Sequence, residues 1–145
     1  MKTLRENRIL IAEDDELSGP LLQNVLRASG PEVFLVQNGV DALNVIDRSP
    51  LDVLITDIDM PEKDGVTLIK EIRRREALKN VPQPLPIIAM SGGGDDELSS
   101  AVRAGATCAL AKPIDMNLID WVLKYLGGRR LDRSVPTKAV AKGML

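Results

Sequence analysis

The chain has 145 residues, of which 44% are apolar and 28% charged, the size and composition of one globular domain with a proper core. It contains no histidine and a single cysteine, which excludes histidine-based catalytic triads, histidine-ligated metals, internal disulfides and cysteine-built zinc sites. The net charge of −2 gives no sign of nucleic-acid binding.

The sequence also lacks the signals of membrane insertion and export. No apolar run approaches the roughly 20 residues that span a bilayer. The first residues, MKTLRENR, lack the apolar core of a signal peptide. We therefore expect a cytoplasmic location without membrane partners.

Short apolar runs alternate with helical patterns along the chain. In chain order, the pattern predicts a strand at 8–12, a helix from 18 to about 29, a strand at 32–36, a helix from 40 to before 50, and a strand at 53–57. It then predicts a helix from 66 to before the proline-rich segment at 81–86, a strand at 87–90, a helix at 95–105, a strand at 108–111, and a helix at 115–126.

This alternation favours a doubly wound α/β fold with a parallel sheet. Among such folds we expect the (βα)5 flavodoxin-like sandwich, whose five-stranded parallel sheet has the order 2-1-3-4-5. Residues 1–126 form this predicted domain. Residues 127–145 carry five basic residues against one aspartate, a net +4, which leaves −6 for the rest of the chain. We interpret them as a basic, flexible tail, with a short docking helix as the alternative.

Polar residues follow the predicted strands where their carboxyl ends meet. Glu13 and Asp14 follow the first strand, Asp57 ends the third, Ser91 follows the fourth and Lys112 follows the fifth. In the predicted strand order they surround one crevice, with Asp57 at its centre.

This set of residues indicates phosphoryl chemistry. Three carboxylates repel one another, and a bound Mg²⁺, which prefers hard oxygen ligands, relieves that repulsion. An aspartate nucleophile attacking phosphorus, with a cation, an ammonium and a hydroxyl taking up charge, would yield an aspartyl phosphate on Asp57.

From about residue 8 to 126 the chain resembles the receiver domain of response regulators in two-component signalling. The resemblance lies in Glu13-Asp14, the segment DIDMPEKDG that begins at Asp57, Ser91, and Lys112-Pro113, all in order and at the family's spacing. The chain thus resembles a single-domain regulator that acts through partner proteins.

The resemblance implies a role for each site residue. Asp57 would accept the phosphoryl group from a histidine kinase or a histidine phosphotransfer protein, in a Mg²⁺-dependent reaction. Ser91 and Lys112 would bind phosphoryl oxygens, and the Lys112-Pro113 bond would be cis. The Mg²⁺ ligands would be Asp14 and Asp57 directly, Asp59 through its backbone carbonyl, and Glu13 through water.

The resemblance also implies that the protein is not an enzyme in the usual sense, since it assists only its own phosphorylation and dephosphorylation. Its downstream target is a protein that the sequence does not identify. Ala109 stands where the family usually has an aromatic switch residue, so the signal needs another route, for which we expect the loop at 92–94 and the helix after it.

Two alternatives remain open from the sequence. One is a phosphohydrolase of the haloacid-dehalogenase type, in which Asp57 and Asp59 would be nucleophile and general acid. Such enzymes usually carry this pair on their first strand and have a cap domain. The other is a degenerate receiver that binds partners without being phosphorylated, against which the acidic pair and Lys112 argue.

Overall fold

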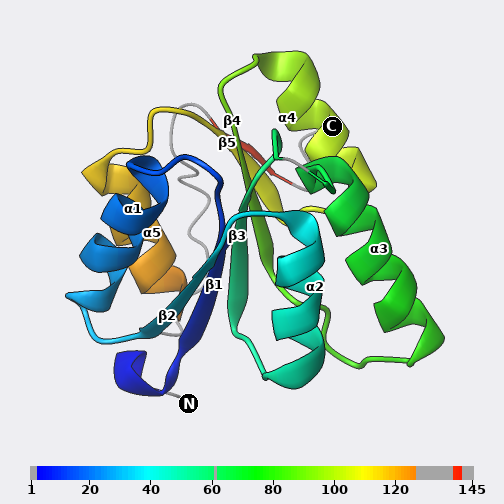
Figure 1. Cartoon of the computed structure of the whole chain (residues 1–145), viewed down its shortest axis with the longest axis horizontal. Helices are drawn as coiled ribbons and strands as arrows, with labels where there is room; N and C mark the ends of the chain where they lie inside the picture. Colours follow the sequence, from blue (N-terminus) through cyan, green and yellow to red (C-terminus); the bar gives the residue numbers. More distant parts are fainter. Residues whose placement is uncertain (1–2, 61, 127–138, 142–145) are drawn as a thin grey trace.

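The computed structural model describes residues 3–60, 62–126 and 139–141, in which strands and helices alternate as predicted (Figure 1). A 3-10 turn, η1 (Leu4–Glu6), comes first. The strands are β1 (Arg8–Ala12), β2 (Glu32–Val36), β3 (Val53–Asp57), β4 (Ile87–Ser91), β5 (Cys108–Ala111) and β6 (Ala139–Ala141). The helices are α1 (Ser18–Arg27), α2 (Gly39–Arg48), α3 (Gly65–Leu78), α4 (Asp95–Ala104) and α5 (Met116–Leu126).

The first five strands form a parallel sheet in the order β2-β1-β3-β4-β5, which confirms the predicted topology. All residues of β3 and of β4 are buried. Their consecutive apolar residues, 53–55 and 87–90, are those expected of strands covered on both faces. Their central position places the carboxyl end of β3 in the middle of one edge of the sheet.

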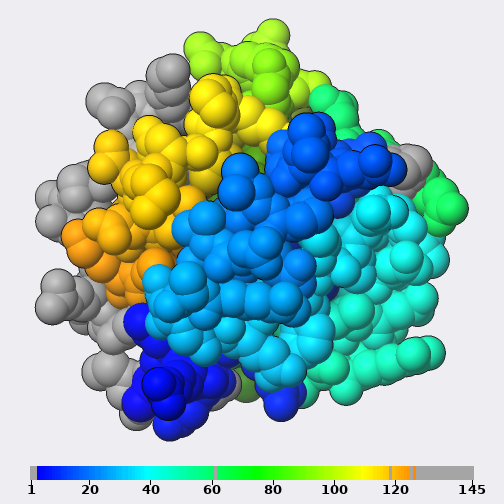
Figure 2. All heavy atoms as spheres, turned by 60° about the vertical axis from the view of Figure 1, so that its left-hand side comes forward, coloured from blue at the N-terminus to red at the C-terminus, as the bar shows by residue number. Residues whose placement is uncertain are grey.

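Helices cover both faces of the sheet, so the domain has three layers (Figure 1). Leu10 and Ala12 of β1 belong to one buried cluster, with residues of α2, α3 and α4. Ile9 and Ile11 belong to the other, with residues of α1 and α5. Successive side chains of a strand point to opposite faces, so β1 contributes to both cores. Figure 2 shows α1, in blue, beside α5, in yellow to orange.

The sixth strand was not predicted. Residues 139–141 were assigned to a flexible tail, but Ala139–Ala141 pairs antiparallel with β5, with Val140 opposite Ala109. The sheet edge at β5 would otherwise have unpaired backbone groups, which another strand can bind. The rest of the predicted tail, residues 127–138 and 142–145, lies outside the described residues.

Local contacts set the start of the helices near the carboxyl edge. Asp64 caps α3 by accepting a hydrogen bond from the Thr67 amide at 2.8 Å. Gly65 then brings α3 against the end of β3, where a Cβ would collide with the carbonyl oxygen of Asp57. In the described part of the chain, no helix has the length and apolar character needed to cross a membrane.

Candidate functional site

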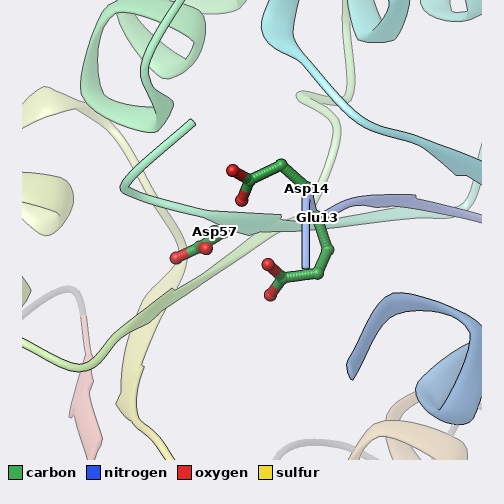
Figure 3. A group of neighbouring side chains, drawn as sticks. All are labelled: Glu13, Asp14 and Asp57. Atoms are coloured by element: carbon green, nitrogen blue, oxygen red, sulfur yellow. The ribbon is translucent and has the colours of Figure 1, made fainter. Parts of the chain in front are cut away.

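Three carboxylates meet at the carboxyl edge of the sheet (Figure 3). Glu13 and Asp14 directly follow β1, and Asp57 is the last residue of the neighbouring β3. One oxygen from each carboxylate lies within 4.8 Å of the others. Glu13 and Asp57 are 2% and 6% exposed, whereas Asp14 is exposed to solvent. The predicted convergence of these three residues is therefore present.

Lys112, the residue directly after β5, joins this cluster from two strands away from β3. Its Nζ donates hydrogen bonds to Oε2 of Glu13 at 2.8 Å and to Oδ2 of Asp57 at 3.0 Å. The Lys112-Pro113 peptide bond is cis, as the resemblance implied. Burial alone would lower the pKa of the Lys112 ammonium, but the two hydrogen bonds and the negative charges of Glu13 and Asp57 together outweigh burial and raise that pKa above its ordinary value.

The charge of Asp57 is only partly compensated. Burial is the largest cause and, together with the nearby Glu13 carboxylate, raises the pKa of Asp57 to about 6 against an opposing hydrogen bond from Lys112. Most Asp57 side chains are nevertheless ionised at neutral pH. Three carboxylates facing one ammonium leave an excess of negative charge, so this cluster has the chemistry of a site for a cation with oxygen ligands.

Ser91 lies beside the cluster, but its hydroxyl has a different partner. Asp57 is in register with Met90, the residue before Ser91. The Ser91 Oγ donates a hydrogen bond to Oε2 of Glu97 in α4 and accepts one from the Gly93 amide at 2.9 Å. Ser91 is thus placed next to the site, while the hydrogen bonds of its hydroxyl hold it to the β4–α4 loop and α4.

Asp59 has its side chain outside the acidic cluster. It is exposed and lines an open groove of about 380 Å³ together with Asp64, Asp96 and Glu97. The haloacid-dehalogenase alternative needs Asp57 and Asp59 to act together as nucleophile and acid. The separation of their environments, one buried beside Lys112 and the other in this groove, does not favour that alternative.

Sequence analysis did not single out Glu97. Asp95, Asp96 and Glu97 all lie in the first turn of α4, where the helix dipole favours negative charge. A carboxylate three residues after Gly94, on a helix that starts just beyond Ser91, was the available signal. Its contact with Ser91 depends on how the glycine loop folds, which the sequence pattern does not specify.

Comparisons with known proteins agree with this geometry. The family described as the response regulator receiver domain matches residues 9–124. The polar-differentiation response regulator DivK of Brucella anthropi is 29% identical over 120 residues, which cover 82% of this chain and 95% of DivK. The sensor histidine kinase GacS of Pseudomonas protegens is 34% identical over 125 residues, 85% of this chain, which spans 14% of that kinase.

Solved structures share the fold. The receiver domain of a sensor histidine kinase from Pseudomonas aeruginosa, with a magnesium ion coordinated in its active-site cleft, has a TM-score of 0.71 at 28% identity, covering 82% of this chain and 95% of that one. A receiver domain from Saccharomyces cerevisiae, crystallised with a histidine phosphotransfer protein, has a TM-score of 0.81 at 21% identity, with coverages of 92% and 97%. From the match over residues 9–124, together with this fold and site, the chain belongs to the response regulator receiver domain family.

Proposed function

We propose that Asp57 is the phosphoacceptor of this receiver domain. The observation that carries the proposal is the pairing of a buried Asp57 carboxylate with Lys112, next to Glu13 and Asp14, at the end of the central strand. In an open α/β sheet, ligands bind at this carboxyl edge. The protein signals by phosphorylation-controlled binding to other proteins and is not a classical enzyme.

The residues present fit Mg²⁺ as the cation of this site. Oxygen ligands from two or three carboxylates, completed by water and phosphate oxygens, are those that Mg²⁺ prefers. Asp14 and Asp57 would bind the ion directly, Glu13 through water, and Asp59 through its backbone carbonyl. When bound, Mg²⁺ supplies positive charge that offsets the repulsion between the carboxylates and an incoming phosphate.

The reaction is a displacement at phosphorus. One carboxylate oxygen of Asp57 forms a bond to the phosphorus, and the bond from phosphorus to the donor breaks, with its electron pair leaving on the donor. Lys112 already bonds Asp57 and would pair with a phosphoryl oxygen. Ser91 would donate a hydrogen bond from its hydroxyl to another phosphoryl oxygen. Catalysis of this kind depends on positioning and charge, with little side-chain acid–base work.

The phosphoryl donor is a histidine kinase or a histidine phosphotransfer protein, because this is the partner class of receiver domains. Since the chain itself has no histidine, the phosphohistidine belongs to that partner. A cytoplasmic location completes the proposal. The free thiol of Cys108 suits a reducing compartment of this kind.

Treatment with acetyl phosphate and Mg²⁺, followed by intact-mass measurement, tests the phosphoacceptor. We expect one acid-labile phosphoryl group on the wild type and none on Asp57→Asn. Asp59→Asn is the matched control, since it keeps the backbone carbonyl proposed to bind Mg²⁺ and changes only a side chain that lies outside the cluster. Equal labelling of wild type and Asp57→Asn would refute the assignment. Repeated turnover of a phosphomonoester would indicate a phosphohydrolase instead.

The metal assignment has its own test, which does not depend on phosphorylation. We expect Mg²⁺ to raise the thermal unfolding temperature of the wild type, because a ligand that binds the folded state stabilises it. Asp14→Asn removes one predicted ligand and should abolish most of this shift. Glu16→Gln, an exposed acid two residues further on, is the control. An undiminished shift in Asp14→Asn would refute the ligand set.

A further inference from the structure

The hydroxyl of Ser91 is committed to a partner on α4. Ser91 is 1% exposed, and its Oγ donates a hydrogen bond to Oε2 of Glu97. A serine hydroxyl has one proton to donate. In this conformation, that proton is therefore not available to a phosphoryl oxygen on Asp57. The residue expected to bind the phosphoryl group must first leave Glu97.

Glu97 reaches Ser91 because the loop between β4 and α4 leaves room for its carboxylate. Glu97 is the third residue of α4, and a Cβ at Gly93 would collide with its side chain. Asp95 and Asp96, in the same helical turn, are exposed, whereas Glu97 is half-buried. Because Gly93 has no side chain, the Glu97 carboxylate can occupy the space beside the loop at this position.

We infer that Glu97 is a positioning residue that competes with the phosphoryl group for the Ser91 hydroxyl. With Asp57 unmodified, the Ser91–Glu97 hydrogen bond holds the first turn of α4 against the end of β4. When Asp57 carries a phosphoryl group, Ser91 donates to it and Glu97 is released. The inference rests on the proposed phosphorylation of Asp57. Position 109, where the family usually has an aromatic switch residue, is an alanine in this chain. We therefore assign to the Glu97 carboxylate the coupling between phosphorylation and the position of α4.

Release of Glu97 would also change a surface. Glu97 lines the open groove together with Asp59, Asp64 and Asp96. A freed carboxylate moves its negative charge and changes the shape of this groove, which extends from the β3–α3 loop to the start of α4. The phosphorylation state of Asp57 is thereby transmitted to exposed residues that a protein partner can contact.

Two variants break the contact by independent means. Glu97→Ala removes the carboxylate. Gly93→Ala places a methyl group in the space that the Glu97 carboxylate occupies, without altering Ser91 or Glu97. Gly93 is not among the described glycines with positive φ, so alanine is compatible with its backbone. The controls are Asp96→Ala, an exposed acid of the same turn, and Gly92→Ala, where an added Cβ meets nothing within 4 Å.

The readout is the initial rate of Asp57 labelling by subsaturating acetyl phosphate, measured by intact mass. Freeing the Ser91 hydroxyl from a charged acceptor should raise this rate by about tenfold in Glu97→Ala and Gly93→Ala. Both controls should remain within about twofold of the wild type. If the wild type is labelled but both test variants match it, the inference is overturned while the proposed function stands. If the wild type takes no label, the proposed function fails and the inference fails with it.

A double-variant comparison separates the hydrogen bond from simple charge repulsion. In a Ser91→Ala background, Glu97 has no hydroxyl to hold, so adding Glu97→Ala should leave the labelling rate unchanged. Acceleration in that background would show that Glu97 acts only by repelling the anionic donor, and would overturn the inference. Hydrogen exchange of the unphosphorylated proteins gives a second readout. The amides of residues 93–98 should exchange faster in Glu97→Ala than in the wild type.

Discussion

Replacing Asp57 by asparagine should make the protein more stable while abolishing phosphorylation. The folded state raises the pKa of Asp57 from 3.8 to about 6, chiefly because burial disfavours the charged form. Below about pH 3.8 the carboxyl is protonated whether the chain is folded or unfolded. As the pH rises from there to about 6, the unfolded chain loses this proton first, so the contribution of Asp57 to stability declines. Above about pH 6 the loss is complete.

The size of the effect follows from the shift. About two pH units at about 1.4 kcal/mol each correspond to about 3 kcal/mol of destabilisation at neutral pH. Asp57 is 6% exposed, so solvent screening reduces this value little. Asparagine resembles the neutral carboxyl in size and leaves Lys112 bonded to Glu13. We therefore expect Asp57→Asn to be more stable than the wild type by about 2–3 kcal/mol at about pH 7.5.

Urea unfolding in EDTA, at about pH 7.5 and about pH 4.5, measures this difference. The difference in free energy of unfolding between Asp57→Asn and the wild type should fall to about 1 kcal/mol at the lower pH, because the Asp57 carboxyl of the unfolded chain is closer to its pKa there. At the higher pH, added Mg²⁺ should reduce this stability difference, because it binds and stabilises the folded wild type. Asp59→Asn, at an exposed carboxylate, should change stability by less than about 0.5 kcal/mol. An Asp57→Asn variant no more stable than the wild type at about pH 7.5 would refute the electrostatic argument.

Three other predictions test the surroundings of the site. Lys112→Met leaves two buried carboxylates without their shared cation. It should therefore lower the free energy of unfolding by about 1–3 kcal/mol at neutral pH and prevent detectable labelling of Asp57. An unchanged urea midpoint would contradict this prediction. Gly65→Ala forces a Cβ against the Asp57 carbonyl oxygen and should lower the free energy of urea unfolding by about 2–4 kcal/mol. Gly92→Ala adds a Cβ in open space and should lower it by less than about 0.5 kcal/mol. Similar losses in the two variants would disprove the close approach of Gly65 to β3. Burial raises the pKa of the Cys108 thiol to about 12, so a thiol reagent should modify it only after unfolding, and rapid modification of the native protein would show that the thiol is accessible.

The sequence by itself determined the sheet and its site-bearing edge. The order of apolar and polar residues along a short segment can be read without knowing the rest of the fold. The apolar runs at 8–12, 32–36 and 108–111 therefore predicted β1, β2 and β5 with the bounds that the structure has. Parallel strands align their carboxyl ends at one edge. The meeting of Asp14, Asp57 and Lys112 therefore followed once the strands were given the flavodoxin-like order, which the structure has.

Tertiary structure decided which atoms bond to one another at that edge. Sequence order placed Ser91 beside Asp57, but a hydroxyl can turn toward any acceptor within reach, and its bond to Glu97 depends on how three consecutive glycines fold. The pairing of Ala139–Ala141 with β5 was equally beyond the pattern, because so short an apolar segment has no periodicity and gains its stability from an edge formed by distant residues. Hydrophobic periodicity records which side of an element is buried, whereas hydrogen-bond partners depend on distances between elements, and those exist only once the chain has packed.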